Sequence, residues 1–438
     1  MSNLRGQEAI DKLTGVTPAM YAPEFRAQMS LPSKIVINDI TLREGRQIEG
    51  TILTADECVK VAEVLVHELN VPMIQMVGGY TDRDREYLKA VSRFLEGCGR
   101  KVRTEAMTSA HQNFPRFNRE QLLETVGHIG DCGFGVVICV ATSDNMLRGC
   151  AIHRNQKHLS IEDLRKQEIE IGVAAIEHAK RRGMSEVNVN FQDFLRADLG
   201  FLKQFARAVA AAGANVICLD DFGGGLAAPR LYTELFRAVK REVPATALGV
   251  HAHNSVGMAV AAALASVEGG CEVVNVGVNG YGDGAGHVSL AETVYQLEFL
   301  YGFDTGIRVD RLRPASVLIA DIMRQDLPKM APLVGDNAFV YIADKHHSFP
   351  DYPFLFCPMK PEVVGNRARP GFGERAGPFG LKLHATALGI TIPDDKIQPV
   401  LRAMEDSMRW RKRALSDNEF RDLVQTVCGN AAQAWKRA

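Results

Sequence analysis

The feature that most constrains the fold is a regular alternation of short apolar runs and helical patterns between residues 34 and 305. The runs are rich in Val and Ile, which is typical of strands buried on both faces. Amphipathic helical patterns such as Ala55–Leu69 and Ile161–Arg182 separate them. The strand candidates, in chain order, are Lys34–Thr41, Val71–Val77, Lys101–Met107, Gly135–Thr142, Glu186–Gln192, Asn215–Asp221, Ala245–His253 and Glu272–Val278.

Eight strand–helix units in about 270 residues match the length and pattern of a (β/α)8 barrel, which belongs to the α/β class. An open, doubly wound sheet is the rival arrangement. No dinucleotide-binding glycine fingerprint follows the first strand candidate, which argues against that rival. We therefore predict a TIM barrel over residues 34–305.

The regions on either side of the barrel lack this alternation of strand and helix patterns. Residues 1–33 contain turn signals and a few aromatic residues, so we expect an N-terminal arm that could pack on a partner subunit. After residue 305 the alternation stops, and Pro and Gly recur. We predict that residues 306–438 form a linker or lid followed by a C-terminal, mainly helical accessory subdomain. Its helical patterns are Leu381–Leu388, Asp394–Arg413 and Asp417–Ala438.

Composition excludes several classes of protein. The 438 residues include 51 Lys and Arg against 52 Asp and Glu, so no strong basic field favours nucleic acid. No apolar run reaches the roughly 18 residues that a membrane helix needs, and the N-terminus shows no signal-peptide pattern. The nine cysteines form no Cys-x-x-Cys pair, which is typical of a reduced protein. We expect a cytoplasmic protein without nucleic-acid or membrane partners.

The candidate chemistry lies where strand candidates end. His251 and His253 close the seventh candidate, and side chains two residues apart on a strand project to the same side. Two neighbouring imidazoles are half of a site for a borderline divalent ion, although such a pair is often a solvated face. Arg43 and Glu44 follow the first candidate and would face the same end of the barrel. One carboxylate and two imidazoles would leave positions open for water and a chelating substrate.

Segment 39–47 reads Asp-x-Thr-Leu-Arg-Glu-Gly-x-Gln, and His251-x-His253-Asn follows much later. This combination resembles the family that contains isopropylmalate synthase, homocitrate synthase, hydroxymethylglutaryl-CoA lyase and 4-hydroxy-2-oxovalerate aldolase. Segment 332–339, Pro-Leu-Val-Gly-Asp-Asn-Ala-Phe, and the downstream His346 are similar to the tail of the synthases. The resemblance therefore favours a synthase-type architecture, usually a homodimer.

The resemblance implies a Claisen condensation of acetyl-CoA, or another acyl-CoA, with a 2-oxo acid on a divalent metal (Mn, Mg, Zn or Co). It makes Glu44, His251 and His253 the metal ligands. Arg43 would stabilise the enolate and alkoxide oxygens, Gln47 would lie near the acyl group, and His346 would act as the acid or base.

Several positions depart from the family pattern. Gln192 stands where the synthases have a glutamate, and glutamine cannot take a proton. Asp221 replaces a threonine, Gln75 replaces a glutamate, and His287 replaces an asparagine in a glycine-rich loop. His287 is either a further metal ligand or a loop histidine whose ring is hydrogen-bonded within the protein. We include it among the predicted metal ligands. The predicted substrate contacts are Gln75, Thr142, Gln192, Asp221 and Asn279.

Two other functions remain open. A lyase or aldolase would break carbon–carbon bonds on the same metal. The aldolases carry a histidine where this chain has Gln47, and the lyases use a cysteine after strand eight, whereas residues 279–290 contain none. A non-catalytic scaffold is disfavoured by the intact set of Arg43, Glu44, His251 and His253.

Overall fold

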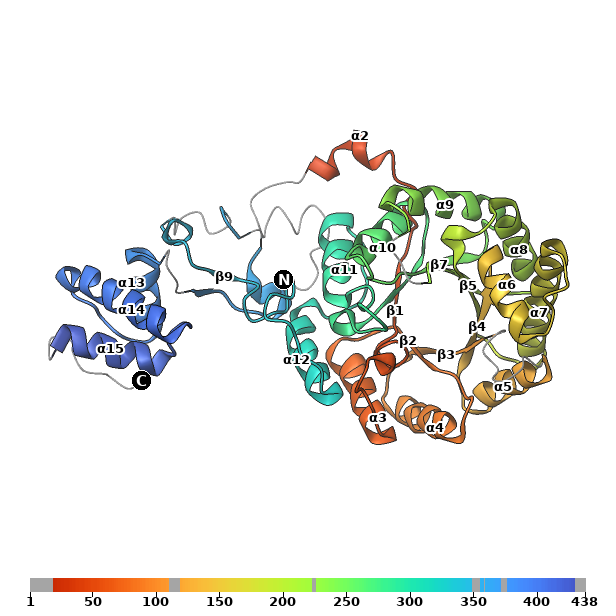
Figure 1. The fold of residues 1–438 in the computed structure, drawn as a ribbon, viewed down its shortest axis with the longest axis horizontal. Coiled ribbons are helices and arrows are strands. Elements are labelled where there is room, and N and C mark those ends of the chain that lie inside the picture. The colour runs from red at the N-terminus through yellow and green to blue at the C-terminus, as the bar shows by residue number, and fades with distance from the viewer. Residues whose placement is uncertain are drawn as a thin grey trace. The chain divides into compact units, whose positions relative to one another are not determined.

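The computed structural model describes residues 19–109, 119–222, 226–348, 355–357, 359–371 and 376–429. The chain forms two compact units that divide after Leu327. The first unit is a closed barrel of eight parallel strands in which each strand pairs with the next and β8 pairs with β1 (Figure 1). The predicted TIM barrel is confirmed. Its strands are β1 Val36–Asp39, β2 Met73–Val77, β3 Arg103–Ser109, β4 Gly135–Ala141, β5 Val187–Gln192, β6 Val216–Asp220, β7 Ala247–His251 and β8 Val273–Val276.

Helices surround the ring of strands (Figure 1). Helix α12 packs against α3, so the first unit continues beyond residue 305, while the three-part division of the chain stays a prediction. The helices of this unit are α2 Pro23–Arg26, α3 Ala55–Glu63, α4 Asp82–Gly97, α5 Arg119–Asp131, α6 Asp144–His153, α7 Ile161–Arg181, α8 Leu199–Ala211, α9 Pro229–Glu242, α10 Ala259–Glu268, α11 Leu290–Gln296 and α12 Leu312–Met323.

Local sequence explains where these elements begin. All seven residues of β4 are buried, as expected for an apolar run that packs on both faces. Helix α3 begins at a capping box in which Thr54 accepts from the N–H of Glu57 and Glu57 accepts from the N–H of Thr54. Thr81 and Asp84 form the same arrangement before α4. These caps satisfy backbone donors that the first helical turn leaves without partners.

The interior of the barrel is partly polar. Glu105 on β3 is buried, and its carboxylate accepts from the side-chain amides of Asn38, Gln75 and Asn188 at 2.7, 2.6 and 2.5 Å. Burial raises the pKa of Glu105, and the three amide donors oppose that rise. Side-chain hydrogen bonds between β1, β2, β3 and β5 therefore hold this layer together.

The second unit contains a small helical bundle. Its elements are β9 Val340–Tyr341, β10 Arg369–Pro370, α13 Pro378–Ala387, α14 Ile397–Arg411 and α15 Asp417–Cys428. The core of this bundle includes Leu381, Val400, Met404, Phe420 and Val424. The predicted C-terminal helical region is therefore present, and the part of the last predicted helix beyond Gly429 lies outside the described residues.

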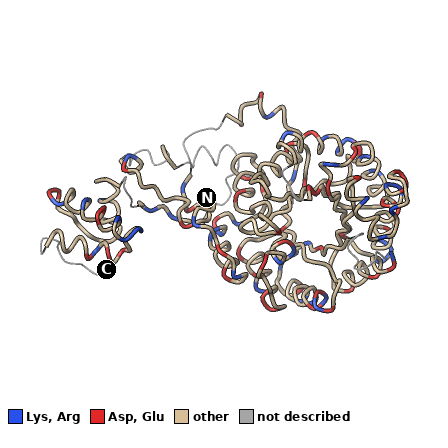
Figure 2. The backbone as a smooth tube through the Cα atoms, viewed as in Figure 1, with Lys and Arg blue, Asp and Glu red and all other residues tan. Residues whose placement is uncertain are grey.

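The charges of the chain are mixed in sign. Positions of Lys and Arg are interspersed with those of Asp and Glu around the helices of the barrel (Figure 2). This agrees with the nearly equal totals of 51 and 52 in the whole sequence. Among the described residues, no helix is long and apolar enough to cross a membrane.

A buried ion pair joins α6 and α7 to the end of β4. Nη1 of Arg154 lies 2.7 Å from Oε2 of Glu168, and the two side chains are 3% and 0% exposed. The other carboxylate oxygen of Glu168 accepts from the backbone N–H of Ala141 at 2.9 Å. Removing one member of such a pair leaves an unpaired charge in the interior.

We predict that Arg154→Ala lowers the free energy of unfolding by about 3–5 kcal/mol, measured by chemical denaturation. The matched control is Arg165→Ala, whose ion pair with Asp144 joins the same two helices but is 24% and 45% exposed. The control should lose less than about 1 kcal/mol, because water screens an exposed pair. Equal losses in the two variants would contradict this account.

Candidate metal centre at the barrel rim

The chain turns sharply after β1, and this turn positions Arg43 and Glu44. The backbone N–H groups of both residues donate to the carbonyl of Ile40, at 2.9 and 2.7 Å. The hydroxyl of Thr41 accepts from the N–H of Val278 at 2.9 Å, which ties the turn to the segment after β8. Arg43 and Glu44 are buried there, at the carboxyl end of the barrel where substrates bind in this fold.

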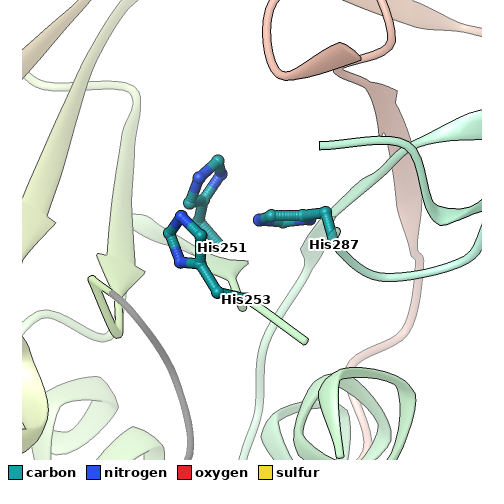
Figure 3. Close-up of side chains that lie close together, drawn as sticks. All are labelled: His251, His253 and His287. Carbon is teal, nitrogen blue, oxygen red and sulfur yellow. The ribbon is translucent and has the colours of Figure 1, made fainter. Parts of the chain in front are cut away.

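Three imidazoles meet at the same end of the barrel. His251 is the last residue of β7, His253 follows two residues later, and His287 lies in the loop after β8. Their rings face a common space (Figure 3), and one nitrogen of each lies within 4.8 Å of the others. The ring centroids of His251 and His287 are 4.1 Å apart, and that of His253 is 5.2 Å from each. A single ion placed between the rings could contact all three.

Glycines bring His287 into this position. Gly280, Gly284 and Gly286 have φ angles of 67°, 61° and 92°, which side chains disfavour. A Cβ atom at Gly286 would lie 2.3 Å from the carbonyl oxygen of Gly280. The N–H of His287 donates to that same carbonyl at 2.8 Å. The glycine-rich sequence of this loop is therefore required by a tight backbone reversal that ends at His287.

Glu44 lies beside the histidines. Its Oε1 atom is 3.2 Å from Nε2 of His251 and also contacts the guanidinium of Arg43. Among the described residues, no hydrogen bond satisfies Oε2 of Glu44, Nε2 of His251 or either ring nitrogen of His287. Buried polar atoms normally have partners. A carboxylate and imidazole nitrogens with unused lone pairs fit a borderline divalent cation.

The electrostatics favour neutral imidazoles at two of the three positions. Burial lowers the pKa of His251 and His287 well below the usual value, and the neighbouring histidines and Arg43 lower it further. A neutral imidazole keeps the lone pair that binds a metal. Both rings are therefore ready for a cation near neutral pH without first losing a proton.

His253 is held by a carboxylate. Oδ1 of Asp221 accepts from the backbone N–H of His253 at 3.0 Å and lies 2.9 Å from Nδ1 of its ring. Oδ2 of Asp221 accepts from the hydroxyl of Tyr232 at 2.8 Å. Burial lowers the pKa of His253, but the hydrogen bond and charge of Asp221 and the charge of Asp220 raise it more. Both oxygens of Asp221, a predicted substrate contact, are thus engaged within the protein.

The other predicted substrate contacts lie on the same unit as the histidines. The amide of Gln75 donates to the buried carboxylate of Glu105 on β3 at 2.6 Å. The hydroxyl of Thr142 donates to the backbone carbonyl of Gln192 at 2.7 Å. The amide of Asn279 donates to a backbone carbonyl of α12 at 2.9 Å, and its buried Oδ1 has no hydrogen-bond partner among the described residues. Their contact with substrate stays a prediction.

Gln47 and His346 are placed differently. Gln47 is exposed in the short 3-10 turn Gly45–Gln47 directly after Glu44. His346 belongs to the second unit, where its ring packs on Tyr341 and Phe356 with centroids 5.3 and 4.4 Å away. The structure therefore brings together Glu44 and the three histidines, while the roles of Gln47 and His346 stay predictions.

Three residues near the centre were missed by the sequence reasoning. Nδ2 of Asn275 lies 3.1 Å from Nδ1 of His251, and an asparagine inside the apolar run of β8 was a signal that could have found it. Tyr232 lies on α9, where a buried aromatic residue predicts only core packing. Tyr80 follows β2; burial raises its pKa, and the charge of Arg43 opposes that rise. No feature of the sequence singled out these two tyrosines.

The fold and this rim define a (β/α)8 barrel with a candidate divalent-metal centre. Comparison with known families gives a more specific identification. The model of the HMGL-like family matches residues 34–319, and the chain belongs to that family.

Several relatives match nearly the whole chain. The chain is 31% identical over 381 residues to the 2-isopropylmalate synthase of Sulfurisphaera tokodaii, covering 86% of this chain and 92% of the relative. It is 30% identical over 400 residues to the (R)-citramalate synthase of Methanocaldococcus jannaschii, covering 91% and 75%. A solved hydroxymethylglutaryl-CoA lyase from Pseudomonas aeruginosa has a TM-score of 0.54 at 21% identity, over 68% of this chain and 96% of that one. That likeness shows the fold.

Asp39 supports a prediction about pH. Burial raises its pKa to about 7, although the N–H and hydroxyl of Thr41 donate to it at 2.9 and 3.1 Å. From about pH 4 to 7 the native carboxyl keeps a proton that the unfolded chain releases, so this group lowers stability as pH rises. Asp39→Asn should remove that loss, which amounts to a few kcal/mol at most. The test measures the unfolding free energies of variant and wild type at pH 5 and at pH 7.5. If the change in unfolding free energy between the two pH values is the same for both proteins, the prediction is wrong.

His287 supports a prediction about metal affinity. In the purified apoprotein, His287→Ala should weaken Co²⁺ or Zn²⁺ binding by about tenfold or more, because one nitrogen ligand is lost. His287→Asn should fall between the wild type and His287→Ala, since an amide oxygen can still coordinate. Titration against a chromophoric chelator measures the affinities. Wild-type affinity in both variants would identify His287 as a loop residue.

Proposed function

We propose that this chain is an acyl-CoA:2-oxo acid C-acyltransferase. It condenses acetyl-CoA, or another acyl-CoA, with a 2-oxo acid to give a product of the 2-alkylmalate or homocitrate type. The observation that carries the proposal is the extent of the likeness to synthases. The aligned stretches of 381 and 400 residues cover 86% and 91% of this chain, and both are longer than the first unit, so they extend into the second.

Glu44, His251, His253 and His287 would hold the divalent ion, which is one of Mn, Mg, Zn or Co. A bound ion of this kind polarises the carbonyl of a chelating 2-oxo acid. The unsatisfied lone pairs of Glu44, His251 and His287 support this assignment. They are buried, so water competes little for the positions that they define.

Arg43 supplies a fixed positive charge beside Glu44. Burial lowers its pKa, but the ordinary value of an arginine is so high that the side chain stays charged. Its guanidinium is held by contact with Oε1 of Glu44. In this position it would stabilise the oxygens on which negative charge develops when the carbon–carbon bond forms. Gln47, in the next turn, would contact the acyl group.

His346 is the proposed base. Burial lowers its pKa, and the nearby Lys345 and His347 lower it further, so the ring is neutral near pH 7. Its turn is anchored where Asp344 accepts from the N–H of Gly380 at 2.9 Å, in the first turn of α13. Assigning the base to His346 agrees with Gln192, whose amide cannot take a proton.

The proposed reaction forms a carbon–carbon bond and then hydrolyses a thioester. His346 would take a proton from the acetyl methyl group, and that carbon would attack the 2-oxo carbon to form the new carbon–carbon bond. The oxygen of the attacked carbonyl takes up the proton that His346 removed. Water then cleaves the thioester: its oxygen joins the new carboxylate, one of its protons goes to the CoA sulfur, which leaves as a free thiol, and the other goes to solvent. Gln75, Thr142, Gln192 and Asn279 are the proposed contacts of the 2-oxo acid. A homodimer remains our expected assembly.

The test is a free-thiol assay of CoA release with Mn²⁺ or Mg²⁺, acetyl-CoA and a panel of 2-oxo acids. We expect release that depends on one class of 2-oxo acid and falls at least about a hundredfold in Glu44→Ala, which removes a proposed ligand. Glu49→Ala, a change at an exposed glutamate in the following loop, is the matched control and should retain activity.

One outcome would favour carbon–carbon cleavage instead. If metal-loaded wild-type protein releases no CoA with any acceptor, the condensation is wrong for these substrates. Incubating the same preparation with a 3-hydroxy-3-methylglutaryl thioester or a 4-hydroxy-2-oxo acid would then reveal a lyase or aldolase through the carbonyl product.

A further inference from the structure

The three histidines of the metal centre are supported in three different ways. His251 has an amide neighbour, Asn275, at 3.1 Å from Nδ1. Neither ring nitrogen of His287 has a hydrogen-bond partner among the described residues. His253 has a carboxylate, that of Asp221, 2.9 Å from Nδ1, the ring nitrogen that points away from the neighbouring rings (Figure 3). Asp221 is 1% exposed, so water does not weaken this contact.

Asp221 is fixed from three sides. Its backbone N–H donates to the carbonyl of His251 at 3.2 Å, and its Oδ1 atom accepts from the backbone N–H of His253 at 3.0 Å. The hydroxyl of Tyr232, which comes from α9, donates to Oδ2 at 2.8 Å. The carboxylate therefore cannot rotate without losing several hydrogen bonds. Its position relative to the ring of His253 is set by β6, β7 and α9 together.

An ionised carboxylate can only accept hydrogen bonds, so the proton of a neutral His253 ring must lie on Nδ1. That leaves the lone pair of Nε2 available on the side of His251 and His287. A carboxylate on the far nitrogen of a metal-binding histidine also makes the imidazole a stronger ligand. The geometry therefore favours one tautomer and one ring orientation of His253.

We propose that Asp221, supported by Tyr232, is a positioning residue that fixes the tautomer and orientation of His253 for metal binding and does not contact the 2-oxo acid. This inference rests on the proposed metal centre. A threonine at this position, as in the family pattern, has no carboxylate to offer. In this chain a carboxylate that holds the metal ligand His253 therefore replaces a hydroxyl that is expected to touch substrate.

The neighbouring Asp220 provides a matched control. It carries the same charge, and its Oδ1 atom lies 3.9 Å from Nδ1 of His253, beyond hydrogen-bond distance. Its two oxygens accept from the N–H of Phe222 at 2.7 Å and from the amide of Asn190 at 2.8 Å. Asp220→Asn therefore removes a nearby charge without removing a hydrogen bond to the ring.

The experiment measures the affinity of the full-length apoprotein for Co²⁺, by competition with a chromophoric chelator and without any substrate. Asp221→Ala should weaken binding by about 10–100-fold. Asp221→Asn keeps an acceptor oxygen but loses the charge, so it should weaken binding less, and Tyr232→Phe should weaken it only a few-fold. Asp220→Asn should stay within about twofold of wild type. The visible absorption of bound Co²⁺ should change in the Asp221 variants and not in Asp220→Asn, a readout that loss of stability alone would not move.

Thermal denaturation of each apoprotein identifies variants that fail to fold. If Asp221→Ala is unfolded, the comparison of Asp221→Asn with Asp220→Asn decides the matter. If the folded Asp221 variants keep wild-type affinity and absorption, the role of Asp221 is wrong but the metal centre stands. The same conclusion follows if Asp220→Asn loses as much Co²⁺ affinity as the Asp221 variants. Absence of Co²⁺ binding by wild-type protein would overturn the metal centre itself. If the protein binds Co²⁺ normally but releases no CoA, only the proposed reaction is contradicted.

Discussion

The closing pair of strands is the constraint on which the candidate site depends. Val36–Asp39 lies in parallel register with Val273–Val276, so the first and last strands of the barrel end at the same level. Asp220 on β6 is likewise in register with His251 on β7. Because all eight strands are parallel, their carboxyl ends share one rim. Glu44 and the histidines are more than 200 residues apart in sequence and still meet there.

Much of this architecture could be predicted, because it depends on patterns that are local in the sequence. A fully buried strand needs an apolar run, and its neighbouring helix needs an amphipathic one, so the alternation of the two appears directly in the residues. The common direction of His251 and His253 follows from the two-residue period of a strand. The glycine-rich loop before His287 also predicted a tight turn, although the sequence did not show which residues the turn would bring together.

Contacts between different elements could not be predicted in the same way. Asp221 was expected to touch substrate because it stands where the family has a threonine that contacts the oxo acid, but its partners, His253 and Tyr232, come from other elements. Strand limits also shifted for reasons of side-chain chemistry. The first strand was expected to reach Thr41, yet it ends at Asp39, because Thr41 donates its N–H to the side chain of Asp39 and the chain turns. Such hydrogen bonds depend on three-dimensional neighbours that a single sequence does not reveal.

The polar layer inside the barrel has a consequence for how this protein can change over evolutionary time. Glu105 depends on amides from β1, β2 and β5, and Asn38 in turn donates to Asn275 on β8 at 3.0 Å. Replacing any one of these residues by an apolar one would leave the others buried with unsatisfied groups, which is costly. Viable replacements must therefore arise together on several strands. We expect these positions to covary among relatives, in contrast to an aliphatic layer, where each side chain can be exchanged almost independently.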